Sequence, residues 1–152
     1  MTRILDPDDT RSTVGGLVHL DTQRAAVGID LTVGGVFRLT GPGSLDFGGS
    51  ELESADRRRV EPRPRSEDDD YGWWELEPGS YVVRYNETLD PGDGELAVVF
   101  PLERLLLAGA SHPAFLADGP RDPLEALLSV GDAGCRIKEN ARVSRGIVLE
   151  SS

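Results

Sequence analysis

Residues 76–101 read LEPGSYVVRYNETLDPGDGELAVVFP, a series of short apolar runs separated by turn residues. Pro78 and Gly79 stand in the order that a type II turn prefers, because proline fixes one central φ angle and glycine tolerates the positive φ of the next position. The segment DPGDG turns the chain again, into the run ELAVVF at 95–100. We therefore predict a strand before the first turn, a strand after it, and a third strand at 95–100 that is buried on both faces.

The same pattern of short runs continues outside this stretch. Eighteen glycines and 10 prolines interrupt segments rich in Val, Leu and Ile, which favours many strands over long helices. Residues 26–39, AVGIDLTVGGVFRL, read as two short strands that meet at Gly34 and Gly35 in a tight hairpin or a bulge. Residues 141–150 read as a closing strand.

Two segments carry helix signals. In FPLERLLLAG, residues 100–109, Pro101 can begin a helix and Gly109 can end it. One face of that helix would carry Leu102, Leu105 and Leu106. LEALLSV, residues 124–130, is open to two interpretations, because the preceding Asp-Pro pair favours a helix whereas its length and the following GDAG turn allow a strand. The sequence predicts a mainly β protein with one short helix.

Composition limits the partners of this chain. At 152 residues it has the length of one domain, which we expect to span 1–152. Twenty-seven acidic and 16 basic residues give a net charge of -11, which argues against binding to nucleic acid or to an anionic membrane. An acidic surface with a single lysine suits concentrated salt, where charge repulsion is screened within about 3 Å. A GC-rich, arginine-favouring coding sequence is the alternative explanation.

Other sequence features exclude whole classes of site. Residues 48–72 are dense in arginine and acidic residues, and we expect a charged flexible loop there. One cysteine and two histidines do not supply a zinc site, so we predict no metal held by protein ligands alone. We find no apolar run of membrane-spanning length and no signal-peptide core at the N-terminus, and we expect a cytoplasmic protein.

The order of four motifs resembles the deoxyuridine triphosphatase (dUTPase) and deoxycytidine triphosphate (dCTP) deaminase family. Residues 28–37, GIDLTVGGVF, resemble its opening motif, and residues 76–101 resemble its turn and strand segment before a Pro-Arg-Ser-Ser-Leu helix. FLADGP at 115–120 and GCRIKENARVSRGIVL at 134–149 resemble the third and the closing motifs. The resemblance implies a dUTPase-like β-barrel (β-clip) fold, a homotrimer, and a divergent member similar to halophilic archaeal dUTPase-type proteins.

The resemblance also implies residue roles. Asp118 would be the catalytic carboxylate that orients a water molecule for attack on the α-phosphate. Asp30 would lie near the metal and phosphate end of a deoxynucleoside triphosphate, and Arg104, Arg142 and Arg145 would bind nucleotide or phosphate. Mg²⁺ would be the cofactor, held mainly by the nucleotide phosphates.

Several positions depart from the family pattern. The phosphate-binding Arg-Ser-Ser is replaced by Leu102-Glu103-Arg104, which adds a negative charge and shifts the arginine by two positions. Asp118 is followed by Gly-Pro-Arg without the aromatic residue that packs under the sugar, and no glycine-rich arm follows before Ser152. Glu125, the nearest match to the deaminase glutamate, is better explained as a residue at the surface or at a strand edge.

Two functions therefore remain open. One is a dUTP diphosphatase-like hydrolase with a partly degenerate site. The alternative is a non-catalytic homologue that acts as a trimeric scaffold or a binding module, with Tyr71, Trp73 and Trp74 as a docking cluster unless a tryptophan belongs to the core. Another small β-barrel or jelly roll is the alternative fold, and a strand at 124–130 would favour the family.

Overall fold

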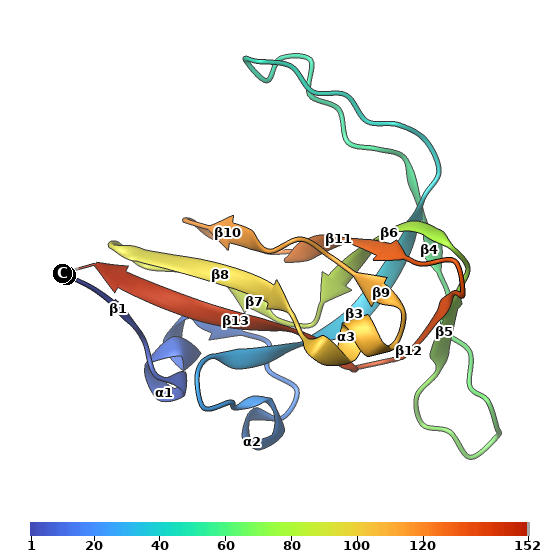
Figure 1. Cartoon of the computed structure of the whole chain (residues 1–152), viewed down its shortest axis with the longest axis horizontal. Helices are drawn as coiled ribbons and strands as arrows, with labels where there is room; N and C mark the ends of the chain where they lie inside the picture. Colours follow the sequence, from blue (N-terminus) through green and yellow to red (C-terminus); the bar gives the residue numbers. More distant parts are fainter. Residues whose placement is uncertain (152) are drawn as a thin grey trace.

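The computed structural model describes residues 1–151, and strands dominate it (Figure 1). A nine-stranded sheet has the order β10-β8-β13-β3-β6-β11-β9, with β1 added beside β13 and β4 beside β3. Among residues 1–151, every strand pairing in this sheet is antiparallel. The members are β1 (Thr2–Ile4), β3 (Ile29–Leu39), β4 (Arg57–Val60), β6 (Gly79–Tyr85), β8 (Glu95–Pro101), β9 (Ala110–Ser111), β10 (Phe115–Ala117), β11 (Glu125–Val130) and β13 (Arg142–Ser151).

Smaller elements flank this sheet. Two-stranded ladders join β5 (Trp73–Leu76) to β12 (Cys135–Lys138) and β2 (Val14–Gly15) to β7 (Thr88–Leu89). The helical segments are α1 (Pro7–Thr10), a 3-10 turn η1 (Arg11–Thr13), α2 (Leu20–Gln23) and α3 (Glu103–Leu107). The prediction of a mainly β protein is confirmed, whereas the prediction of a single short helix is wrong, because α1 and α2 were not foreseen. Among residues 1–151, none of these helices has the length and apolar character needed to span a lipid bilayer.

Strand β3 joins the two halves of the sheet. Its first residues pair with β13, and its later residues pair with β6 and β4. The register shifts between Val33 and Gly35, which confirms the bulge and excludes a hairpin at the glycine pair. A Cβ atom on Gly34 would lie 2.5 Å from the side-chain oxygen of Asn86, so the close approach of that side chain requires glycine.

The Pro78-Gly79 turn links two different sheets. Strand β5 pairs with β12 and not with β6, so the strands on either side of the turn do not form a hairpin. Strand β8 is buried from Ala97 to Val99, as expected, but Phe100 is exposed.

Helix α3 is shorter than the sequence indicated. Pro101 is the last residue of β8, and Leu102 is the N-cap residue with extended backbone angles. Leu105 is buried, but Leu106 is 68% exposed, so the predicted leucine face is wrong at that position. Gly109 has a φ of 95°, the positive value that ends a helix after its C-cap. The helix has only five residues because the chain enters β9 directly afterwards.

Residues 125–130 form strand β11, which resolves the ambiguous segment in favour of the family. The strand pairs with β6 on one side and β9 on the other. Ala126, Leu128 and Val130 face the core while Leu127 is exposed, the alternation of a half-buried strand. Sheet pairing on two sides outweighs the helix-start signal of the preceding Asp-Pro pair.

The charged segment at 48–72 is more ordered than predicted. Residues Arg57–Val60 form β4 and pair with β3, so the expectation of a flexible loop is wrong there. Arg63 and Trp73 exchange backbone hydrogen bonds of 2.9 and 2.8 Å, which tie the later part of the segment to β5. Asp69 accepts backbone hydrogen bonds from Arg65 and Ser66, and these bonds lower its pKa.

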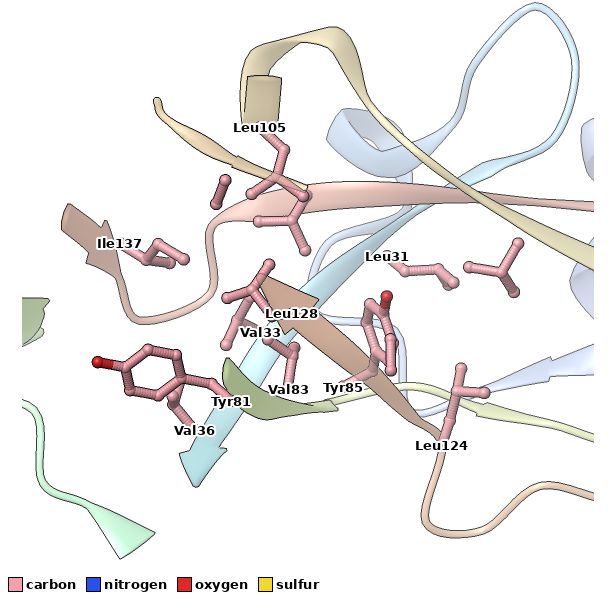
Figure 2. Packing of buried hydrophobic residues seen from close by; sticks show 14 of the residues in the cluster. Leu31, Val33, Val36, Tyr81, Val83, Tyr85, Leu105, Leu124, Leu128 and Ile137 are labelled. Carbon is pink, nitrogen blue, oxygen red and sulfur yellow. The ribbon is translucent and has the colours of Figure 1, made fainter. Parts of the chain in front are cut away.

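One hydrophobic cluster lies between the two halves of the curled sheet. Figure 2 shows Val33, Val83 and Leu128 side by side, with Leu105 of α3 and Ile137 of β12 packed at the same end. Trp74 is 1% exposed and donates a 2.9 Å hydrogen bond to the carbonyl of Val60. The predicted aromatic docking cluster is therefore wrong for Trp74, which belongs to the core.

Candidate functional site

The centre of the site is a carboxylate that two arginines hold. Asp30 in β3 is 3% exposed. Its Oδ2 accepts a 3.0 Å hydrogen bond from the Nη1 of Arg142, and its Oδ1 accepts a 2.9 Å bond from the Nε of Arg145. Both arginines are about one-third exposed, so the carboxylate is buried while its partners reach the surface. Three of the five predicted site residues therefore lie in one cluster.

A bulge in β13 makes this cluster possible. Residues three apart on a regular strand point to opposite faces. The register of β13 shifts between Arg142 and Ser144, so one extra residue is inserted and the two arginines return to the same face. Arg145 lies directly opposite Asp30, and Arg142 lies opposite Thr32, the next position of β3 on that face.

A cavity of about 370 Å³ opens beside this cluster, and we call it the α2–β13 cavity. Residues of α2, β3 and the β12–β13 turn line it, including Thr22, Thr32 and Asn140. Arg104 from α3 and Arg142 from β13 also line it, which brings a fourth predicted site residue to the same place. Arg142 additionally donates a 3.4 Å hydrogen bond to the carbonyl of Thr22. Lys138 of β12 lines it as well, so the cavity presents cations from three separate elements.

A second cavity of about 490 Å³ adjoins the first, because Arg104, Lys138 and Arg142 line both. We call it the basic groove. Its cationic side chains are Arg104, Arg136, Lys138 and Arg142, its apolar side chains include Leu107 and Trp73, and none of its lining residues is acidic.

Asp118 does not join this cluster within one chain. Its side chain is 88% exposed, and its nearest cation is Arg121 at 3.7 Å. Asp118 follows β10, whose Ala117 pairs with Ala97 of β8, whereas Arg145 lies opposite Phe100. This register separates the two side chains by about 13 Å along the strands and about 10 Å across them.

A buried polar network supports the cavity wall, and the sequence analysis did not identify it. Glu87 is fully buried and accepts hydrogen bonds from the Thr32 amide at 2.7 Å, the Thr32 hydroxyl at 2.6 Å and the Gln23 side-chain amide at 3.0 Å. Gln23 also donates to the Asp30 carbonyl at 2.9 Å. Burial raises the pKa of Glu87 despite these bonds. The network therefore fixes α2 against β3 next to Asp30.

The alternation of side chains along β6 could have predicted that Glu87 is buried. Strand side chains alternate between two faces, and the alternate positions continue past the end of β6. The positions on the core face are Tyr81, Val83, Tyr85, Glu87 and Leu89, and all five are buried. A glutamate on the core face requires hydrogen-bond donors, which predicts a network at this point.

A second buried network surrounds His112, which is 6% exposed. Its Nδ1–H donates to the Pro113 carbonyl at 2.8 Å, and its Nε2 accepts from the Ser144 hydroxyl at 2.7 Å. The Tyr85 hydroxyl lies 2.6 Å from the Ser144 hydroxyl. Burial lowers the pKa of His112 and raises that of Tyr85. Ser144 has no exposed surface, so this network is structural and not a site for a nucleophile.

The remaining sequence candidates have structural partners. Glu125 forms ion pairs with Arg57 at 2.9 Å and Arg84 at 3.0 Å, on the outer face of the sheet. Cys135 is buried, and burial raises its pKa, as expected of an unreactive core thiol.

Comparisons with known proteins decide the family. The chain is 34% identical over 128 residues to a probable deoxyuridine 5'-triphosphate nucleotidohydrolase of Methanosarcina acetivorans, an alignment that covers 83% of this chain and 71% of the relative. The chain belongs to the dUTPase/dCTP deaminase family. A probable nucleotidohydrolase of Archaeoglobus fulgidus is 30% identical over 137 residues, with 89% and 77% covered. A comparison with protein-family models finds no match.

A solved structure supports the fold of this dUTPase/dCTP deaminase family member. The 2'-deoxycytidine 5'-triphosphate deaminase of Agrobacterium tumefaciens superposes with a TM-score of 0.66 at 14% identity. The superposition covers 99% of this chain and 49% of the deaminase, so the chain spans about half the length of that protein. The prediction of a dUTPase-like β fold is confirmed.

Proposed function

We propose that this chain is a dUTPase-like protein that binds a deoxynucleoside triphosphate in the α2–β13 cavity. We also propose that it is a single domain and forms a homotrimer in the cytoplasm. The observation that carries the proposal is the convergence of Arg104 and Arg142 on one cavity, with Arg142 aligned by the buried Asp30. Arginine suits this role because its planar group forms paired hydrogen bonds with phosphate oxygens. The named activity of the relatives, deoxyuridine 5'-triphosphate nucleotide hydrolysis, gives the substrate class.

The geometry supports a changed role for Asp30. Both of its oxygens accept bonds from arginines and the side chain is almost fully buried, so Asp30 aligns cations and does not face a ligand. Within residues 1–151, no three His, Cys, Asp or Glu side chains converge to form a cation site. These residues fit a Mg²⁺ ion that the nucleotide phosphates hold, as Mg²⁺ commonly is in phosphate sites. The ion would neutralise phosphate charge.

Hydrolysis at this site needs a second copy of the chain. In the proposed reaction a water oxygen bonds to the α-phosphorus, the bond to the bridging oxygen breaks, and pyrophosphate leaves with that electron pair. Asp118 would orient the water and accept its proton. Because Asp118 is distant from Arg142 within one chain, we propose that it acts at the cavity of a neighbouring subunit.

A specific observation favours the non-catalytic alternative. The N-cap residue of α3, Leu102, makes no side-chain hydrogen bond to the helix, and Glu103 adds a carboxylate in the first turn. Phosphate is stabilised at helix N-termini by amides and positive charge, so this end of α3 is a poor phosphate site. On this alternative the chain retains nucleotide binding or a scaffold role without turnover.

The test separates binding from turnover. We would measure dUTP and dCTP binding by calorimetry with Mg²⁺, and pyrophosphate release in parallel, at low and molar salt. Arg142→Ala should weaken binding at least tenfold, whereas Arg3→Ala, which removes an exposed arginine paired with Glu150, should not. Asp118→Asn should retain binding and abolish pyrophosphate release. Binding without release in the native chain would favour the alternative, and no binding at either salt concentration would refute the proposal.

A further inference from the structure

A long arm projects from the body of the molecule between β3 and β4. We define the arm as residues 40–56, and Figure 1 shows it extending away from the sheet and from α3. Three apolar side chains of the arm face solvent: Leu45 is 85% exposed, Phe47 is fully exposed and Leu52 is 64% exposed. Large apolar side chains that face solvent along a projection are typical of an interaction surface.

The arm is ordered by its own hydrogen bonds. Ser44 and Glu53 exchange backbone bonds of 3.0 and 2.9 Å, which pair the two sides. At the tip, the Asp46 carboxylate accepts bonds from the amides of Gly49 at 2.8 Å and Glu51 at 3.1 Å. The tip is thus held in one conformation before it meets a partner, which reduces the entropy lost on binding.

The charge of the arm has one sign. Its ionisable residues are Asp46, Glu51, Glu53 and Asp56, and it contains no lysine, arginine or histidine. A partner surface should therefore be cationic and should offer apolar side chains to Phe47 and Leu45.

The basic groove has these properties. It combines four cationic side chains with apolar walls, and no acidic residue lines it. Leu107 at its edge is 77% exposed. Two of the four cations, Arg136 and Arg142, already pair with Glu75 and Asp30. Within residues 1–151 neither Arg104 nor Lys138 forms an ion pair, although the Lys138 ammonium lies over the Trp73 ring, so these two are the cations left for an acidic partner.

We propose that the arm of one chain docks in the basic groove of a second copy, with Phe47 against Leu107 and the acidic side chains on Arg104 and Lys138. The arm does not reach the groove of its own chain, because it points away from α3 (Figure 1). Because the arm and the groove are different surfaces, each contact is head-to-tail. Repeating this contact closes a ring if the rotation between neighbouring chains divides a full turn evenly. Arg104 lines the α2–β13 cavity as well as the basic groove, so the arm and a nucleotide would compete for it. The contact is therefore tested on the nucleotide-free chain, and its failure would leave the proposed nucleotide binding untouched.

Sedimentation velocity of the nucleotide-free chain over a concentration series tests this contact. The native chain should associate, and Phe47→Asp or Leu107→Asp should each raise the dissociation constant at least tenfold. Leu106→Asp is the matched control, because Leu106 is similarly exposed on the same helix but does not line the groove. Ser50→Ala is the control on the arm. Because Phe47 and Leu107 are exposed, neither variant should change the free energy of unfolding of the monomer appreciably.

A cross-link locates the contact. Differently tagged Phe47→Cys and Leu107→Cys chains, mixed under mild oxidation, should give a covalent heterodimer, and Phe47→Cys mixed with Leu116→Cys on β10 should not. The proposal is overturned if the native chain is monomeric throughout, if both aspartate variants associate like the native chain, or if the mixed Phe47–Leu107 cross-link does not form.

Discussion

Replacement of Glu87 by glutamine should destabilise the protein although it changes a single atom. The two carboxylate oxygens accept from three donors: the amide and hydroxyl of Thr32 and the side-chain amide of Gln23. In glutamine one oxygen becomes an NH₂ group, which donates and does not accept. If the NH₂ group takes the place of Oε1, it faces the Thr32 N–H. If it takes the place of Oε2, it faces the side-chain amide of Gln23. Either orientation leaves one buried donor without an acceptor.

An unsatisfied buried donor costs about 1–3 kcal/mol. For a domain of this length that corresponds to a fall of about 3–10 °C in Tm. The free energy of unfolding should be measured by urea denaturation at pH 7, with tryptophan fluorescence as the signal. Glu77→Gln is the matched control, because its side chain is 84% exposed and its 3.6 Å ion pair with Arg38 contributes little.

A stable variant would refute the reasoning. If Glu87→Gln unfolds within about 0.5 kcal/mol of the native chain, the margin typical of surface substitutions, the network does not impose its donor and acceptor pattern. The same experiment reports on the site, because the network holds α2 beside Asp30. A destabilised variant should therefore also bind nucleotide less tightly than the Glu77→Gln control.

Three further substitutions test the fold and the site by denaturant unfolding. Leu105→Ala should cost about 2–5 kcal/mol because it leaves a cavity in the core, whereas the exposed Leu106→Ala should stay within about 0.5 kcal/mol. Asp30→Asn should cost about 1–3 kcal/mol through its arginine bonds, while Asp8→Asn, in an exposed pair, should cost little. Burial lowers the pKa of His112 in the folded chain, so on acidification the unfolded chain takes up a proton at this residue first. The free energy of unfolding of the native chain should therefore fall relative to that of His112→Gln as pH falls below 6.5.

Local sequence determined much of the fold, because turns and strand periods are local properties. The glycine pair in β3 predicted a hairpin or a bulge, and the structure has a bulge. Apolar runs bounded by turn residues predicted β6 and the closing strand β13. The segment at 124–130 was ambiguous, since its start favoured a helix while its length allowed a strand. Pairing with β6 and β9 decided it, and those partners lie far away in the sequence.

The site was predictable in part. The resemblance placed Asp30 and Arg142 at matching motif positions, and the structure brings them together at 3.0 Å. The pairing of both arginines with Asp30 was not predictable, because residues three apart on a strand normally face opposite ways. A bulge between Arg142 and Ser144 reverses that expectation, and sequence periodicity does not reveal it.

The sequence by itself determined the class of the protein: its acidic charge, its β-rich order of turns and strands, and the family motifs in their order. Only the tertiary structure decided which charges meet. Antiparallel pairing of β13 with β3 places Asp30 against Arg145, and the same sheet holds Asp118 after β10, two strands away from β13. Composition and local propensity act over a few residues, whereas these contacts depend on strand register across more than 100 positions of the chain.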